Sequence, residues 1–189
     1  MHELLRALRR TPDRVLHTRR RGAALANIRA RNQPSSVLVL CHGNICRSPF
    51  AAAVLDRELA GQGTAVVSAG FIGPGRPSPL EAQLEAQHLG VDLSLHRSQL
   101  VTDQLVRNAA VVVTMDAQQA RAVVETFGKP RADVVLLGDF DPEPVRTRTI
   151  ADPIDQPADV YRRVYARIER CAQALASAIT ETPAPSDRP

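Results

Sequence analysis

The stretch VLVLCHGNICRSPF at residues 37–50 joins two kinds of sequence that require different surroundings. Its first four residues are apolar, as is typical of a strand buried on both faces of a parallel sheet. The residues that follow include two cysteines, a histidine, a glycine, an asparagine, an arginine and a serine. The stretch therefore predicts a buried strand that ends in a loop of reactive side chains.

Apolar strand-like segments alternate with helical segments on both sides of this stretch. Strands are expected at residues 37–40, 65–68, 109–114 and 134–137, and helices at 49–61, 79–90, 116–127 and 157–179. With right-handed crossovers, this alternation predicts an α/β fold in three αβα layers, with a doubly wound, four-stranded parallel sheet. Ligands bind such sheets at the carboxyl ends of the strands, which is where the loop at residues 41–48 is placed.

The amino-acid composition indicates the class of protein to which the chain belongs. The chain has 189 residues, of which 44% are hydrophobic and 23% charged, as in an ordinary globular domain with a substantial core. Its three cysteines cannot all pair and are widely spaced, which favours a reducing compartment. No apolar run approaches the roughly 20 residues that span a bilayer, and the N-terminus lacks the apolar core of a signal peptide. We expect a cytoplasmic protein without a transmembrane segment.

Positive charge is concentrated at the N-terminus. Residues 1–33 hold nine arginines against Glu3 and Asp13, a balance of +7, while the rest of the chain has a balance of −3. Apolar residues recur there at helical spacing, so a basic helix packed against the body or a partner is expected. A basic arm also suits an acidic partner or an anionic membrane surface. Nucleic acid is disfavoured, because the arm has no aromatic side chain for base stacking.

The loop at residues 41–48 has the composition of an anion site. It directly precedes a helix, whose N-terminus offers unpaired N–H groups and a partial positive charge. Arg47 adds a planar fork that can hold two phosphate oxygens. The same field favours a thiolate, and cysteines in such settings have pKa values lowered to roughly 3.5–7.5. Cys41 is therefore predicted to be a nucleophile that faces a bound phosphate.

Residues 41–49, CHGNICRSP, resemble the phosphate-binding signature of the low-molecular-weight protein tyrosine phosphatases, C-x-G-N-x-C-R-S-P. The resemblance continues in the family's order through Ser-Ala-Gly at 68–70, His96, Thr-Met-Asp at 114–116 and Asp-Pro at 152–153. It implies a phosphatase domain at residues 36–180. A basic helical extension at 1–35 would precede the domain, and a disordered tail at 181–189 would follow it.

The resemblance also implies catalytic roles. Cys41 would attack phosphorus and form a cysteinyl-phosphate, held by Arg47 and the loop amides. Asp152 would protonate the leaving phenolic oxygen and then activate water. Ser48 would hydrogen-bond the thiolate, and Cys46 would trap an oxidised nucleophile as a disulfide. The family needs neither a metal nor a cofactor.

A phosphate-binding set and a supporting set complete the implied site. Asn44 would adopt a strained conformation, held by Ser48, Ser68 and His96. The residues expected around the phosphate are His42, Gly43, Asn44, Ile45, Cys46, Arg47 and Ser48.

Substrate specificity is less defined by the sequence than the chemistry. Many family members place an aromatic residue after Asp-Pro, whereas Ile154 follows here, so Phe71, Ile72 and Ile154 are the candidate pocket walls. Ile45 resembles the tyrosine-specific loop, while phosphoarginine-specific relatives commonly have threonine at this position.

Three functions follow as hypotheses. The first is a phosphotyrosine protein phosphatase with a bacterial tyrosine kinase as candidate partner. The second is a different reaction on the same scaffold, either phosphoarginine hydrolysis or arsenate reduction. Thioredoxin-coupled arsenate reduction needs two further relay cysteines, which residues 48–170 lack. The third is a non-catalytic phosphate-binding module, which has no need for a thiolate or an acid.

Overall fold

The structure is a computed structural model that describes residues 2–181, with side chains described from residue 16 onward. The predicted disordered tail lies outside the described residues except for Glu181. The elements in chain order are α1 (His2–Arg29), β1 (Ser36–Cys41), α2 (Arg47–Glu58), β2 (Ala65–Gly70), α3 (Leu80–Gln87), α4 (Asp103–Asn108), β3 (Val111–Thr114), α5 (Ala117–Phe127), the 3-10 turn η1 (Arg131–Asp133), β4 (Val134–Leu136), the 3-10 turn η2 (Leu137–Phe140) and α6 (Ala158–Thr180).

The expected four-stranded parallel sheet is confirmed, with strand order β2-β1-β3-β4. In its register Cys41 pairs with Gly70, and Leu40 pairs with Thr114. The carboxyl ends of β1, β2 and β3 therefore meet at one edge of the sheet, which places the segments after these strands side by side.

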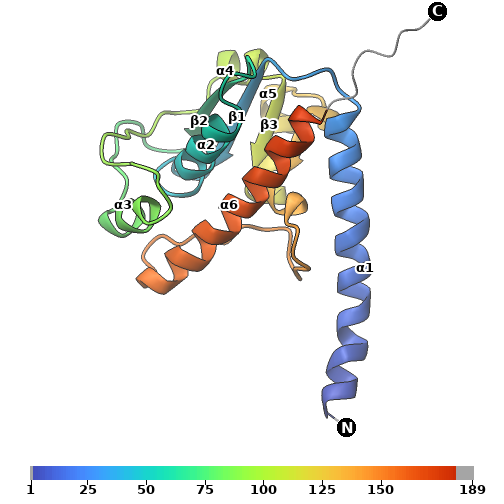
Figure 1. The fold of residues 1–189 in the computed structure, drawn as a ribbon. Helices are drawn as coiled ribbons and strands as arrows, with labels where there is room; N and C mark the ends of the chain where they lie inside the picture. Colours follow the sequence, from blue (N-terminus) through green and yellow to red (C-terminus); the bar gives the residue numbers. More distant parts are fainter. Residues whose placement is uncertain (1, 182–189) are drawn as a thin grey trace, which may run out of the picture.

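Helices cover both faces of the sheet, as Figure 1 shows. Val37 and Val39 of β1 pack in one apolar cluster with α2 and α6, whereas Leu38 and Leu40 pack in the other with α4 and α5. This division follows from the period of two along a strand, which sends successive side chains to opposite faces. Both faces of β1 are buried, which explains its uninterrupted apolar sequence.

Helix α1 is attached to the body through its second half, while its first half projects past the body in Figure 1. Ile28 is 1% exposed in the core, and His17 Nε2 lies 3.0 Å from the carbonyl oxygen of Asp141. After the helix, Arg31 forms an ion pair of 2.8 Å with Asp133. These contacts join the helix to η1, η2 and α6.

One expected helix begins earlier than predicted, and one helix was not expected. Helix α2 begins at Arg47 rather than Pro49. Proline is tolerated in a first turn, because the N–H groups there have no partner within the helix. Helix α4 was not predicted, since six residues are too few to show a helical period.

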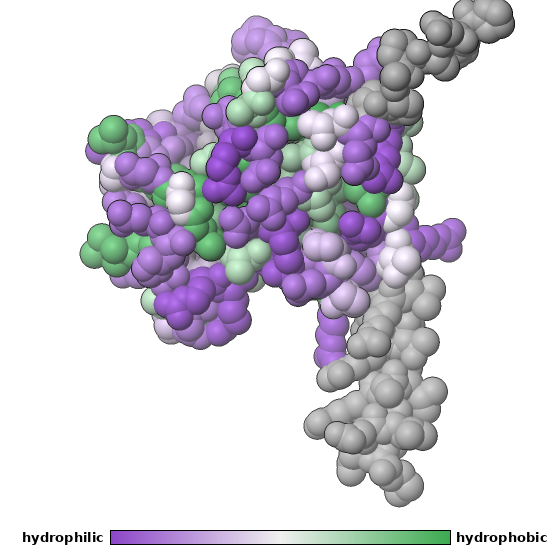
Figure 2. Space-filling view, viewed as in Figure 1, coloured by the Kyte–Doolittle hydropathy of each residue, from purple (hydrophilic) through white to green (hydrophobic). Residues whose placement is uncertain are grey.

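The surface of the body is mixed. Figure 2 shows one face covered mostly by hydrophilic residues, with hydrophobic ones in separate small areas. Within residues 2–181, no helix is both long and apolar enough to cross a membrane.

Candidate active site

Cys41 lies at the carboxyl end of β1 and is almost fully buried, with 2% of its surface exposed. Its Sγ accepts a hydrogen bond from the backbone N–H of Asn44 at 3.2 Å and another from Ser48 Oγ at 3.0 Å. The loop at residues 42–46 therefore curls around the sulfur and brings the first turn of α2 beneath it.

Asn44 is the central residue of this loop. It is fully buried, and its φ of 51° lies in the left-handed region, which asparagine tolerates better than most residues. Its Nδ2 donates to Ser48 Oγ and Ser68 Oγ, both at 2.9 Å, and its carbonyl oxygen lies 2.7 Å from His96 Nε2. The structure thus brings together the four residues expected to support the loop.

Gln99 also supports the loop, although nothing in the sequence singled it out. Its backbone N–H donates to Asn44 Oδ1 at 2.9 Å, and its side-chain Nε2 donates to the carbonyl oxygen of Ser68 at 2.8 Å. A backbone donor can belong to any residue type except proline, so no side-chain signal marks it.

Strand β2 approaches the loop so closely that a side chain at Gly70 would displace the loop backbone. A Cβ atom on Gly70 would lie 2.7 Å from the backbone nitrogen of Asn44. The carbonyl oxygen of His42 accepts from the backbone N–H of Phe71 at 2.8 Å and of Ile72 at 3.2 Å. These contacts fix the outer side of the loop to the segment that follows β2.

Arg76 is a second residue that the sequence did not indicate. Its Nη2 donates to the carbonyl oxygens of Gly43 at 2.8 Å and of Ile72 at 3.1 Å, and its Nε donates to Gly73 at 2.9 Å. A Cβ atom on Gly43 would lie 2.9 Å from this guanidinium, so the glycine leaves room for it. Arg76 therefore holds the backbone of the loop at the rim of the site through hydrogen bonds.

Arg47 occupies the first position of α2 and is 4% exposed. Its Nη1 donates to the carbonyl oxygen of Ile150 at 3.2 Å, and its Nη2 forms an ion pair with Asp152. Its Nε is buried and has no hydrogen-bond partner among the described residues. The guanidinium thus retains a buried donor, as a site for an anion would require.

Asp152 completes the site from the segment that leads to α6. Its side chain is 37% exposed, and its Oδ1 accepts from the backbone N–H of Ile154 at 3.3 Å. The backbone N–H of Ile150 donates to the carbonyl oxygen of Met115 at 2.9 Å, which ties this segment to the end of β3.

The residues predicted to react line one pocket of about 210 Å³. Cys41, Arg47 and Asp152 all reach it, and three isoleucines supply its apolar walls. The residues that line this catalytic pocket are Cys41, His42, Gly43, Ile45, Cys46, Arg47, Ile72, Arg76, Asp152 and Ile154. Of the candidate wall residues, Ile72 and Ile154 line this pocket.

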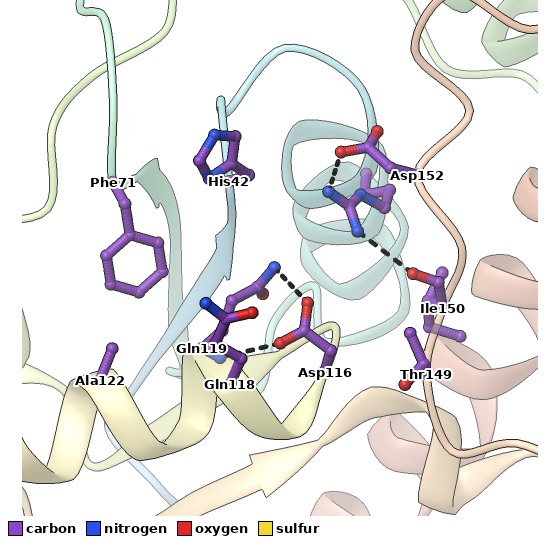
Figure 3. A pocket seen from close by; sticks show the side chains of 10 residues that line it. His42, Phe71, Asp116, Gln118, Gln119, Ala122, Thr149, Ile150 and Asp152 are labelled. Atoms are coloured by element: carbon purple, nitrogen blue, oxygen red, sulfur yellow. Dashed lines mark hydrogen bonds and ion pairs between the residues drawn. The ribbon is translucent and has the colours of Figure 1, made fainter.

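Phe71 lines a second cavity instead, of about 520 Å³. Figure 3 shows this cavity between the start of α5 and the segment before α6. The two cavities adjoin, because three side chains line both of them. The residues that line the second cavity are His42, Arg47, Phe71, Asp116, Gln118, Gln119, Ala122, Thr149, Ile150 and Asp152.

Cys46 differs from Cys41 in its surroundings. Burial, with the nearby charges of Asp152 and Cys41, raises the pKa of the Cys46 thiol to about 12. Tyr165, which stacks on Phe50 with ring centroids 4.2 Å apart, donates its hydroxyl to the Cys46 carbonyl oxygen at 3.2 Å. Cys46 is therefore a protonated thiol at neutral pH, on a loop end anchored to α6.

Cys171 lies away from the site. It is fully buried on α6, and burial raises its pKa to about 12 as well. It belongs to the apolar cluster between the sheet and α6, which agrees with a packing role.

The fold and the loop at residues 41–48 correspond to one protein family. Residues 36–184 match the family described as low molecular weight phosphotyrosine protein phosphatase. This chain belongs to that family.

Two proteins with similar sequences come from bacteria. The chain is 34% identical over 143 residues to the probable low molecular weight protein-tyrosine-phosphatase EpsP of Ralstonia nicotianae, an alignment that covers 74% of this chain and 92% of EpsP. It is 33% identical over 147 residues to Wzb of Salmonella typhi, a low molecular weight protein-tyrosine-phosphatase, with 77% of this chain and 94% of Wzb covered.

Solved structures with a similar fold include a tyrosine phosphatase and an arginine phosphatase. The Erwinia amylovora tyrosine phosphatase amsI superposes with a TM-score of 0.69 at 29% identity, covering 77% of this chain and 93% of amsI. The YwlE arginine phosphatase from Geobacillus stearothermophilus also has a TM-score of 0.69 at 29% identity, covering 77% of this chain and 92% of YwlE.

Proposed function

We propose that this chain is a protein tyrosine phosphatase that hydrolyses phosphotyrosine through a cysteinyl-phosphate intermediate. One observation carries the proposal: Cys41, Arg47 and Asp152 line a single pocket at the N-terminus of α2. A nucleophile, an anion-binding fork and an acid are the three groups that this reaction needs.

The phosphate group would bind between the loop amides and Arg47. Its oxygens can take the guanidinium donors now directed at Asp152 together with the unpaired Nε. Arg47 would thus exchange one anionic partner for another. The carboxyl group of Asp152 would then be available for the oxygen that joins phosphorus to the tyrosine ring.

The first chemical step would transfer the phosphoryl group to sulfur. The Cys41 thiolate forms a bond to phosphorus while the bond from phosphorus to the phenolic oxygen breaks. The protonated Asp152 gives its proton to that oxygen, so tyrosine leaves as a neutral phenol.

The second step would return the enzyme to its starting state. The Asp152 carboxylate removes a proton from a water molecule as the water oxygen attacks phosphorus, and the bond from sulfur to phosphorus breaks. Ser48 Oγ and the Asn44 N–H lie at hydrogen-bond distance from Sγ and stabilise the thiolate as it leaves. Inorganic phosphate is released.

The substrate would be a phosphotyrosine protein. The apolar walls formed by Ile45, Ile72 and Ile154 suit an aromatic ring better than a short polar side chain. A tyrosine kinase is the candidate partner on the strength of the family resemblance. Three free cysteines support a reducing, cytoplasmic location.

The proposed domain organisation gives residues 1–35 a separate task. Residues 36–180 would form the phosphatase domain, which fits the family match from residue 36. The basic extension would use its second half to attach to the body, as the burial of Ile28 supports. Its projecting first half would then bind an acidic partner or an anionic membrane surface.

Asp152 is tested by its dependence on the leaving group. Asp152→Asn should slow phenyl phosphate by about 10²–10⁴-fold and p-nitrophenyl phosphate much less, because nitrophenolate needs little protonation. Cys41→Ser should abolish turnover of both esters. Asp155→Asn is the matched control, since the exposed Asp155 has a φ of 58° that asparagine also tolerates. Steady-state kinetics on both esters measures these effects.

Two outcomes would contradict the proposal. Appreciable activity in folded Cys41→Ser would exclude the cysteinyl-phosphate, and a leaving-group effect confined to Asp155→Asn would assign the acid role to Asp155.

Phosphotyrosine, phosphoserine and phosphoarginine peptides assayed in parallel test specificity. Turnover of the phosphoarginine peptide alone would favour a phosphoarginine phosphatase.

A further inference from the structure

We propose that the second cavity is a binding subsite for the substrate residue next to the phosphotyrosine, and that it selects lysine or arginine. The inference rests on the proposed function and adds a sequence preference to it.

The position of the cavity suits a neighbouring residue. His42, Arg47 and Asp152 line both cavities, whereas Cys41 lines the catalytic pocket alone. Asp152 acts where the tyrosine oxygen leaves, so the second cavity adjoins the leaving-group side. Consecutive Cα atoms in a substrate are about 3.8 Å apart, so the side chain beside the phosphotyrosine can enter an adjoining cavity.

Asp116 gives the cavity a negative charge without a cationic partner. Its Oδ1 accepts from the backbone N–H of Gln119 at 2.8 Å, and its Oδ2 accepts from Gln119 Nε2 at 2.7 Å. Both donors are neutral, and among residues 16–181 Asp116 takes part in no ion pair. A carboxylate has about four acceptor positions, so it can still bind an ammonium or guanidinium group.

Arg47 does not neutralise Asp116. It is the one arginine or lysine among the lining residues, and it is already bound to Asp152 and to the Ile150 carbonyl oxygen. During catalysis it would hold the phosphate instead. The cavity therefore offers its uncompensated carboxylate to a substrate cation and repels an acidic side chain.

The remaining lining matches the shape of a long basic side chain. Phe71 offers a ring to a cation or to a methylene chain, and Ala122 adds apolar surface. Gln118 and Thr149 supply further polar groups. Figure 3 shows Asp116, Gln118 and Gln119 at the start of α5, across the cavity from His42.

Paired peptides test the proposal. Two phosphotyrosine peptides differ only in lysine or glutamate beside the phosphotyrosine, placed before it in one pair and after it in another. For wild type, kcat/KM should favour lysine by about tenfold in one of the pairs, the size expected for one favourable charge contact near a protein surface. Asp116→Asn should reduce this ratio to about twofold.

Gln118→Lys gives a second variant that does not depend on Asp116. Gln118 is exposed on α5, so a lysine there adds a cation to the cavity without disturbing the core. The lysine-to-glutamate ratio should fall to about twofold, because the added lysine offsets the charge of Asp116. Thr126→Lys is the matched control, because it adds the same charge to an exposed position of α5 outside the cavity, and it should keep the wild-type ratio.

The design separates this inference from the proposed function. Asparagine can still accept the bond from the Gln119 N–H that caps α5, and the ratio of two peptides cancels any loss of activity common to both. If wild type does not hydrolyse p-nitrophenyl phosphate, the proposed function fails. If wild type does hydrolyse this ester, either of two results overturns the subsite. One is a lysine-to-glutamate ratio near one in wild type, and the other is the same ratio in wild type, Asp116→Asn and Gln118→Lys.

Discussion

Asn44 shows how much of the site depends on one residue. It turns the chain at a φ of 51°, and its side-chain amide and its carbonyl oxygen bind four other residues that come from α2, β2 and the segment before α4. The cost of a left-handed backbone, about 1–3 kcal/mol, is offset because every polar group of the side chain is satisfied. A loop held in this way presents its amides in one fixed arrangement, which suits binding to a phosphate.

Oxidation should distinguish the three cysteines. Mild peroxide is expected to inactivate the enzyme reversibly: Cys41 is oxidised to a sulfenic acid, which condenses with the Cys46 thiol to a disulfide and releases water. Both residues line the catalytic pocket, while Cys171 lies in the core. The raised pKa of Cys46 keeps it a thiol and prevents it from reacting first.

Mass spectrometry of the digested, oxidised protein measures this linkage. Cys46→Ser is the control: without a thiol to condense with, the sulfenic acid of Cys41 is oxidised by further peroxide to a sulfinic acid, so activity should not recover on reduction. A linkage found only between Cys41 and Cys171, or an irreversible loss in wild type, would contradict the prediction.

At the scale of elements, α1 is the helix whose attachment is least evident from its own sequence. Its second half contacts η1, η2 and α6, elements that lie more than 100 residues further along the chain. Ile28 fills a core position, whereas Leu16 on the same helix is 44% exposed. Within residues 16–29, burial of single side chains thus decides which face of the helix packs on the body.

Ile28→Ala should lower the free energy of unfolding by about 2–4 kcal/mol, because it removes buried methyl groups and leaves a cavity. Leu16→Ala is the control and should change it by less than about 0.5 kcal/mol, as for other exposed positions. Urea denaturation followed by circular dichroism measures both. Equal effects would mean that the helix does not dock through Ile28.

For the whole molecule, the buried ionisable groups on α6 and at the start of α2 set the behaviour in alkali. Burial raises the pKa values of Cys46, Cys171, Tyr161 and Tyr165. The chain has 23 arginines and one lysine, Lys129, so almost all of its basic side chains stay charged in this range. Alkaline titration therefore acts mainly on the buried thiols and phenols.

Stability should decrease as the pH rises above about 9. The folded state holds these protons to a higher pH than the unfolded state, so their contribution is complete below the unfolded pKa and lost above it. Each group should lower the free energy of unfolding by about 1.4 kcal/mol per pH unit between its unfolded and folded pKa values. Urea denaturation at pH 8, 9 and 10 measures the slope, and Cys171→Ala should make it shallower. A flat profile from pH 8 to 10 would refute the prediction.

The sequence alone predicted those features that depend on neighbouring residues. Apolar runs alternating with helical segments predicted the parallel sheet, because burial on two faces leaves a pattern in a few consecutive residues. The order of residues 41–49 predicted the loop, because a strand end and a helix start enclose it. The family resemblance then added Ser68, His96 and Asp152, which lie far along the chain.

The tertiary structure decided the features that depend on register and distance. The Arg76 guanidinium donates to a backbone carbonyl oxygen of the loop, and the backbone N–H of Gln99 donates to Asn44, so in each pair one partner is a backbone group that carries no residue identity. Phe71, a candidate wall of the catalytic pocket, lines the second cavity instead. That cavity combines the segments after β1, β2 and β3 with the one before α6, and only the packing of the sheet and helices brings these together. Local patterns fix which residues form an element, whereas the volume enclosed between elements is a property of their packing.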